Sequence, residues 1–207
     1  MFDKTHLIKK DDALSGRDQC VVISNRHYVN GNILYGNFDG GLEKIVVGMG
    51  CFWGAERLFW KIKGVYSTSV GYCGGYTKNP TYEEVCSRKT GHAEVVRVVF
   101  DPKIISFEKI IKIFFENHNP TEYMRQGNDI GSQYRSVIFT SNDIQYDVAN
   151  KIAIDFESKL IDNGFDKIKT QIEMVGDYFF AEEYHQQYLA KNTNGYCGLK
   201  GTGVSCL

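Results

Sequence analysis

The stretch IVVGMGCFWGAERLFWKIKG, residues 45–64, determines how the rest of the chain is interpreted. Its first six residues form a short apolar run that predicts a buried strand. The residues that follow place apolar side chains close to helical spacing, and Gly64 stands where a helix would stop. The sequence therefore predicts a strand that leads directly into a helix, with Cys51 at the junction.

Strand and helix patterns keep alternating after this unit. Strands are predicted at 65–72, 95–100, 136–140 and 168–174, and helices at 106–118 and from 141 or 142 to 164. The second helix is long and amphipathic, with an apolar residue every four positions from Ile144 to Leu160. This alternation predicts one α/β layer structure in which helices pack on a mixed sheet, while the strand order stays open.

Length and composition limit the class of protein and its partners. The chain has 207 residues, 43% of them hydrophobic and 24% charged, which suits one compact domain and excludes intrinsic disorder as the main state. Lysine and arginine total 24 against 25 acidic residues, so neither nucleic acid nor an anionic membrane is an expected partner. The apolar runs are too short to span a bilayer, and the N-terminus lacks the pattern of a secretory signal. The predicted compartment is the cytoplasm.

Cys51 has the surroundings of a reactive thiol. At the start of a helix, free backbone N–H groups and the positive end of the helix dipole stabilise a thiolate. Gly50 and Gly54 let other groups approach the sulfur, and the bulky Phe52 and Trp53 would form an apolar wall beside it. Two alternatives compete with a nucleophile: a small buried cysteine, and a glycine-rich nucleotide-binding turn. The bulky aromatic residues weaken the second alternative.

A glycine-rich tail carries two further cysteines, Cys197 and Cys206. Its flexibility would allow one thiol to reach an oxidised Cys51, form a disulfide with it, and pass that disulfide on by exchange. The alternative is a disordered terminus with incidental cysteines. Metal binding is not expected, because the sequence has no CxxC or HxxxH pair. The remaining three cysteines are interpreted as structural thiols: Cys20, Cys73 and Cys86.

Six separated blocks resemble, in order and spacing, the methionine sulfoxide reductase A family. They are GCFWGAE at 50–56, GYCGGYTKNPTYEEVC at 71–86, TGHAE at 90–94, QGNDIGSQYRS at 126–136, AEEYHQQYL at 181–189, and GYCG with GTGVSC at 195–206. The polar leader is similar to that of the longer bacterial members. The resemblance implies an α+β fold, a two-layer α/β sandwich whose mixed sheet is built from plaited, ferredoxin-like βαβ units. It also implies a long N-terminal arm and a C-terminal coil.

The resemblance implies a role for each matching residue. Cys51 would attack the sulfoxide sulfur, and Glu94 would donate a proton to the sulfoxide oxygen, which is otherwise a poor leaving group. The implied substrate-binding residues are Phe52 and Trp53 for the methyl group, Tyr82 and Tyr134 for the sulfoxide oxygen, and Asp129 as a polar lining residue. His185 lies in a matching block, where a catalytic role and a packing role both stay open.

The implied activity is that of a peptide-methionine (S)-S-oxide reductase, which repairs methionine-S-sulfoxide, free or in oxidised proteins. Cys51 would become a sulfenic acid, Cys197 would attack it, and Cys206 would resolve the first disulfide. Thioredoxin would then reduce the Cys197–Cys206 pair. No metal or organic cofactor is implied, and a monomer is expected. A thiol peroxidase and a non-catalytic nucleotide-binding module remain as alternative functions.

One catalytic domain over residues 1–207 is expected. Its parts would be a wrapping N-terminal arm at 1–40, a catalytic core at 41–190, and a glycine-rich tail at 191–207 that carries the recycling cysteines. In this division the chemistry belongs to the core, and the regeneration of the enzyme depends on the tail.

Overall fold

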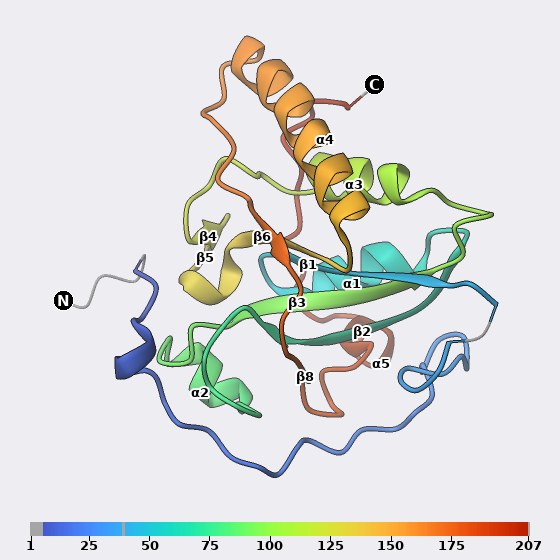
Figure 1. Ribbon diagram of the computed structural model, residues 1–207, viewed down its shortest axis with the longest axis vertical. Helices are drawn as coiled ribbons and strands as arrows, with labels where there is room; N and C mark the ends of the chain where they lie inside the picture. Colours follow the sequence, from blue (N-terminus) through green and yellow to red (C-terminus); the bar gives the residue numbers. More distant parts are fainter. Residues whose placement is uncertain (1–5, 39, 207) are drawn as a thin grey trace.

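The computed structural model describes residues 6–38 and 40–206 (Figure 1). Residues 1–5 and 39 of the expected arm, and residue 207 of the expected tail, lie outside the described residues. The strands are β1 (Glu43–Met49), β2 (Val65–Cys73), β3 (Ala93–Phe100), β4 (Arg125–Gln126), β5 (Asp129–Ile130), β6 (Ser136–Thr140), β7 (Gln171–Met174) and β8 (Tyr178–Phe180). The helices are α1 (Phe52–Trp60), α2 (Tyr82–Cys86), α3 (Phe107–Glu116), α4 (Asp143–Asp162) and α5 (Tyr188–Lys191), with 3₁₀ turns η1 (Lys10–Asp12) and η2 (Ser132–Tyr134).

Six of the strands form one mixed sheet in the order β7-β6-β1-β3-β2-β8. The central strands β1 and β3 are antiparallel, and the β6–β7 pair at one edge is parallel. The connection β1–α1–β2 therefore passes over β3, and the connection β3–α3–β6 passes over β1. These two interleaved βαβ units, to which α4 and β7 add a third, confirm the plaited sheet that the resemblance implies.

Helices α1, α3 and α4 cover one face of the sheet and enclose the main core with it (Figure 1). Strand alternation assigns side chains to the two faces. Val96 and Val98 of β3 belong to the helix-side core, whereas Val95 belongs to a smaller cluster on the opposite face. Glu94 lies two residues before Val96 in β3, so its side chain is on the same face of the sheet as Val96 and Val98. Its carboxyl group therefore lies on the helix side, beneath the start of α1.

The long helices and the central strands agree with the sequence prediction, whereas several short elements were not predicted. Helix α3 begins after Ser106, whose side chain accepts a hydrogen bond from the backbone of the first turn, and α4 begins after Asn142 in the same way. The pattern does not identify α2, β8 and α5, each five residues or fewer. Strand β7 is shorter than the predicted 168–174, and Ile144 of the predicted apolar stripe is 78% exposed.

Two extended segments lie on the outside of this core. The N-terminal arm runs past α2 and on to the start of β2, where Asn32 donates to the carbonyl of Tyr66 (Figure 1). The C-terminal tail passes α1 at Leu199 and ends against α3. None of the described helices is both long and apolar enough to cross a membrane.

Candidate active site

Cys51 occupies the N-cap position of α1, directly after β1 ends. Gly50 turns the chain between the two elements with a φ of +90°, and a Cβ at this residue would stand 2.6 Å from the Cβ of Gln126. Both demands require glycine. Because Val47 pairs with Val96 in antiparallel register, the end of β1 lies beside the beginning of β3. The half-buried Cys51 is thereby brought to the same end of the sheet as Glu94.

Glu94 is a buried carboxylic acid held against the start of α1. Its side chain is 1% exposed, and its Oε2 accepts a hydrogen bond from the backbone N–H of Phe52 at 3.1 Å. Burial is the main influence on its acidity and raises the pKa of Glu94 to about 8. The Phe52 N–H opposes this rise, and the nearby charge of Asp129 adds to it. At neutral pH the group is therefore mostly protonated and able to donate a proton.

The Cys51 thiol is not ionised by its position alone. Burial, the largest effect, raises the pKa of Cys51 well above its usual range, and the charge of Glu94 raises it further. The backbone N–H of Trp53 lowers this pKa but does not compensate. The start of α1 thus favours the thiolate as expected, but burial and the charge of Glu94 outweigh this effect. Protonation of Glu94 removes one negative charge that raises the pKa of Cys51. A protonated Glu94 and a Cys51 thiolate can therefore stand side by side.

Aromatic side chains line the position next to the sulfur. Trp53 stacks on Tyr188 with ring centroids 3.9 Å apart, and its indole N–H donates to Nδ1 of His185 at 3.1 Å. The His185 ring also lies 4.5 Å from the ring of Tyr82 and 5.2 Å from that of Phe52. Burial lowers the pKa of His185 to about 4, so the imidazole is neutral. His185 therefore packs between the aromatic residues and accepts from Trp53.

Asp129 and Tyr134 approach from the β4–β5 hairpin and from η2. The charge of Asp129 raises the pKa values of both Glu94 and Cys51, which places it in the same electrostatic neighbourhood. Burial, followed by the charge of Glu94, raises the pKa of Tyr134 above its usual range. The hydroxyl of Tyr196 donates to Oδ2 of Asp129 at 3.4 Å and links the tail to this side of the site.

Cys197 lies close to Cys51 because residue 54 of α1 is a glycine. A Cβ at Gly54 would stand 2.9 Å from Sγ of Cys197 and 3.1 Å from Cβ of Leu199. The absence of that Cβ lets this part of the tail pack directly on the first turn of α1. Cys197 also contributes to the raised pKa of Cys51, as expected for two sulfurs in the same site.

Cys206 is placed elsewhere, against α3. Its backbone N–H donates to Oε1 of Glu116 at 2.7 Å, and its sulfur lies 3.8 Å from the carbonyl oxygen of Lys112. Ser205 donates to the same Glu116 oxygen at 3.0 Å. All six cysteines are free, and Cys197 and Cys206 lie against different helices, α1 and α3.

Several residues around the site have no role in the sequence interpretation. Glu182 accepts from the hydroxyl of Tyr72 at 3.0 Å and from the backbone N–H of Tyr82 at 2.8 Å, which fixes the start of α2. Cys86 is half-buried, and burial raises the pKa of its thiol. Glu182 and Tyr188 fall within the AEEYHQQYL block, but periodicity carries no signal for such long-range contacts. Of the other predicted structural thiols, Cys73 is buried and Cys20 is exposed.

Across residues 6–38 and 40–206, no group of three or more His, Cys, Asp and Glu side chains is arranged to hold a metal ion. The backbone N–H of Phe52 at the start of α1 donates to Glu94. It is therefore not offered to a phosphate group, which argues against the nucleotide-binding alternative.

A thiol at a helix start, a buried acid that is mostly protonated, a cluster of aromatic rings and a second thiol nearby are together typical of a cysteine-dependent oxidoreductase. The family model for peptide methionine sulfoxide reductase matches residues 43–204. Peptide methionine sulfoxide reductase MsrA of Brucella anthropi is 55% identical over 203 residues, which cover 98% of this chain and 93% of that protein. The human mitochondrial peptide methionine sulfoxide reductase is 54% identical and covers 98% of this chain and 86% of its own length.

Solved structures agree with this assignment. Methionine sulfoxide reductase A of Corynebacterium diphtheriae superposes with a TM-score of 0.88 at 42% identity, covering 97% of this chain and 98% of that one. Reduced Mxr1 of Saccharomyces cerevisiae gives a TM-score of 0.73 at 34% identity, covering 79% and 92%. The chain belongs to the peptide methionine sulfoxide reductase family. It is an oxidoreductase that acts on methionine sulfoxide.

Proposed function

We propose that this chain reduces the S epimer of methionine sulfoxide, free or within oxidised proteins, with Cys51 as nucleophile and Glu94 as proton donor. The observation that carries the proposal is the buried carboxyl group of Glu94, fixed by the Phe52 N–H at 3.1 Å and with a pKa raised by burial to about 8. A sulfoxide oxygen leaves only after protonation, and a carboxyl group that is mostly protonated at neutral pH supplies that proton.

In the first step the Cys51 sulfur attacks the sulfoxide sulfur while Glu94 protonates the sulfoxide oxygen. The oxygen is transferred to Cys51, and the proton of the Cys51 thiol restores Glu94. Methionine leaves, and Cys51 becomes a sulfenic acid. The two electrons that reduce the substrate thus come from the Cys51 sulfur.

Substrate is held by the groups around the sulfur. We assign the methyl group of the substrate to the wall made by Phe52 and Trp53, whose indole is fixed by His185 and Tyr188. Tyr82 and Tyr134 are assigned to the sulfoxide oxygen, because the charge of Glu94 contributes to the raised pKa of both phenols. Asp129 completes the polar side of the pocket.

Recycling uses the two thiols of the tail. The Cys197 thiol attacks the sulfenic acid, releases water and forms a disulfide with Cys51. Cys206 then leaves α3, attacks Cys197 and frees the Cys51 thiol. A dithiol reductant then reduces the Cys197–Cys206 disulfide, and we propose thioredoxin as this reductant. Yeast Mxr1, 34% identical in its reduced form, has been solved in complex with Trx2, which supports this partner.

We propose a cytoplasmic monomer that needs neither metal nor organic cofactor, although relatives from bacteria and from mitochondria are equally similar. We also propose that residues 1–207 act as one catalytic unit, with the arm at 1–40, the core at 41–190 and the recycling tail at 191–207. Size-exclusion chromatography of the reduced protein tests the monomer.

The experiment that tests the function uses separated S and R epimers of a methionine sulfoxide substrate. Purified protein is mixed with each epimer, thioredoxin, thioredoxin reductase and NADPH, and released methionine is measured. Methionine from the S epimer alone is expected. Release from both epimers would contradict the stereochemical assignment. Release with dithiothreitol but not with thioredoxin would contradict the thioredoxin assignment and leave the chemical step intact.

Replacing Cys197 with serine is expected to stop the enzyme after one turnover. Cys51 and Glu94 remain, so about one equivalent of methionine per enzyme should be released, and the sulfenic acid should then persist because its resolving thiol is missing. Quenched-flow measurement of methionine, with dimedone labelling of Cys51, checks both points. Continued turnover with thioredoxin at the unmodified rate would show that Cys197 is not the resolving thiol.

A further inference from the structure

One wall of the substrate pocket comes from a segment with little regular structure. Two residues fix the Trp53 indole: His185, in the turn between β8 and α5, and Tyr188, the first residue of α5. Between them, Gln187 has φ 49° and ψ 40°, a left-handed conformation that a residue with a side chain adopts rarely. Such a conformation persists only when surrounding contacts determine it. The contacts that hold Gln187 therefore also determine where His185 and Tyr188 stand.

The main support of Gln187 is a buried carboxyl group on α1. Glu56 is 0% exposed, and its Oε2 accepts from the backbone N–H of Gln187 at 2.8 Å. Its Oε1 accepts from the side-chain amide of Gln187 at 2.7 Å and from the hydroxyl of Thr68 at 3.1 Å. Glu56 lies three residues after Trp53 on the same helix, so α1 carries both the pocket wall and the group that positions the facing wall.

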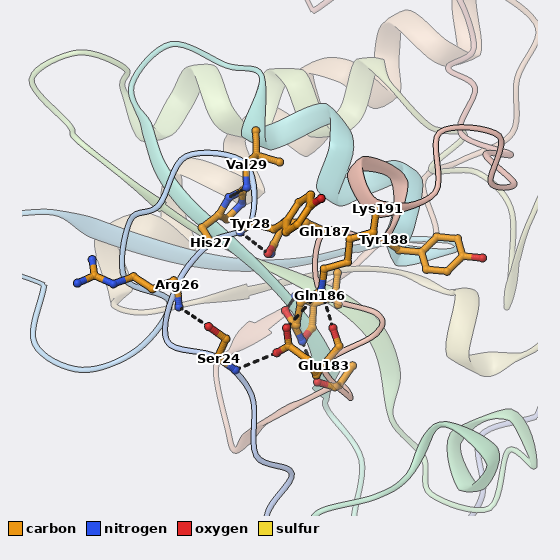
Figure 2. A network of polar contacts seen from close by, with 12 residues as sticks. Ser24, Arg26, His27, Tyr28, Val29, Glu183, Gln186, Gln187, Tyr188 and Lys191 are labelled. Atoms are coloured by element: carbon orange, nitrogen blue, oxygen red, sulfur yellow. Dashed lines mark hydrogen bonds and ion pairs between the residues drawn. The ribbon is translucent and has the colours of Figure 1, made fainter.

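The second support comes from the N-terminal arm, as Figure 2 shows. The backbone N–H of Tyr28 donates to the side-chain oxygen of Gln187 at 3.0 Å, and that of Ser24 donates to Glu183 at 2.8 Å. The arm thus binds the side-chain oxygen of Gln187, and Glu56 binds its side-chain NH₂ group and its backbone N–H.

A chain of hydrogen bonds joins the arm to Glu56. Nδ1 of His27 accepts from the backbone N–H of Val29 at 3.2 Å, so its proton is on Nε2. That Nε2 lies 2.9 Å from the hydroxyl of Thr68, which in turn donates to Glu56. Burial lowers the pKa of His27 to about 4, in agreement with a neutral ring. Each donor in the chain therefore has an acceptor.

We propose that Glu56, together with arm residues 24–29, positions the substrate pocket by fixing the left-handed turn at Gln187, and so places His185 and Tyr188 against Trp53. This inference rests on the proposed function, because it assigns the Trp53 wall to the substrate. Glu56 is a positioning residue: its contacts are to Gln187 and Thr68, and it reaches the pocket through them. The arm is then part of the catalytic architecture rather than a separate covering.

Glu56→Gln tests the proposal with a change of one atom. An amide at this position offers one oxygen where Gln187 presents two donors, so one donor loses its acceptor and faces an N–H group instead. The KM for methionine sulfoxide is expected to rise about tenfold, while the single-turnover rate at saturating substrate changes less than about threefold. The isosteric replacement keeps the fold, which circular dichroism verifies.

A second readout does not depend on turnover. The indole N–H proton of Trp53 is followed by nuclear magnetic resonance in the resting protein, with its signal assigned by Trp60→Phe, because the chain has two tryptophans. Loss of the turn at Gln187 should loosen the bond to His185 and speed exchange of this proton with solvent about tenfold. The proposal is overturned if either the KM or this exchange rate is unchanged in Glu56→Gln.

Matched controls separate positioning from general destabilisation. Glu157→Gln removes a carboxylate on α4 that accepts from the backbone N–H of Ile168 at 2.9 Å, and it should leave KM and indole exchange unchanged. An equal rise in KM in Glu157→Gln would overturn the proposal. His27→Leu removes the arm's link to Thr68 and should shift both readouts in the same direction as Glu56→Gln, by a smaller factor. Unchanged values there would overturn the role of the arm.

The two proposals fail separately. If the epimer assay gave no methionine, the proposed function would fail, while indole exchange in the resting protein would still report on the turn at Gln187. If the epimer assay succeeded and Glu56→Gln behaved like the unmodified protein, only the positioning role would fail.

Discussion

Cys51→Ser is expected to abolish methionine release, with a loss of at least about 10⁴-fold in both single and multiple turnover. A serine hydroxyl is a far weaker nucleophile than a thiol and cannot accept the sulfoxide oxygen as a sulfenic acid. The change is small, because serine also suits the N-cap position of α1. Released methionine is measured over hours with dithiothreitol as reductant, so that the tail cysteines do not limit the result.

The control for this substitution is Cys20→Ser. Cys20 is exposed on the arm, so its loss should leave the rate unchanged. Thermal unfolding of both variants should match that of the unmodified protein, which links the loss of activity to the sulfur. Residual turnover in Cys51→Ser above about one part in 10⁴ would mean that another thiol starts the reaction.

Glu94→Gln is expected to slow the first step by about 10²–10⁴-fold, the usual contribution of a positioned general acid. The amide keeps the size of the side chain, and its oxygen can still accept from the Phe52 N–H. What is lost is the proton for the sulfoxide oxygen. The effect should fall on the single-turnover rate more than on KM, since the substituted group acts in the transition state.

The pH dependence provides an independent check of Glu94. Because burial raises the pKa of Glu94 to about 8, the group is protonated below that pH and loses its proton above it. The first step in the unmodified protein should therefore be slowed about tenfold per pH unit above pH 8. Glu94→Gln should lack this decline, whereas Glu157→Gln on α4 should keep it. A decline that persists in Glu94→Gln would assign it to another group.

The fold could be predicted from sequence where local signals are strong. The apolar run before Cys51, the cap at Ser106 and the cap at Asn142 each mark an element that the structure contains. Helix α2 was missed because five residues show no periodicity. Its start carries a local signal in the capping box of Thr81 and Glu84, and Glu182, a hundred residues away, adds a bond from the Tyr82 N–H. Ile144 is misplaced because helical spacing alone does not tell which end of a stripe reaches the core.

The sequence predicted which residues form the candidate site better than it predicted their pKa values. Motif resemblance names Cys51, Glu94 and the aromatic residues, and the structure brings them to one end of the sheet. The raised pKa of Cys51 could not be read from its place at a helix start, because burial and the charge of Glu94 are tertiary effects. Gln187 and Glu56 carry no signal of their partnership, which joins residues 131 positions apart.

The end of β1 and the beginning of β3 meet in the middle of a hydrogen-bonded sheet, whereas Ser205 and Cys206 are each attached to Glu116 by one exposed or half-buried hydrogen bond. Local opening differs greatly between two such places, since a central strand opens only with the whole domain and a surface tail frays on its own. In the proposed mechanism the oxygen-accepting step thus depends on the stability of the whole domain, whereas regeneration depends on a tail that surface contacts hold. In the proposed mechanism, a change in the tail would therefore leave Cys51 and Glu94 where the register of two neighbouring strands places them.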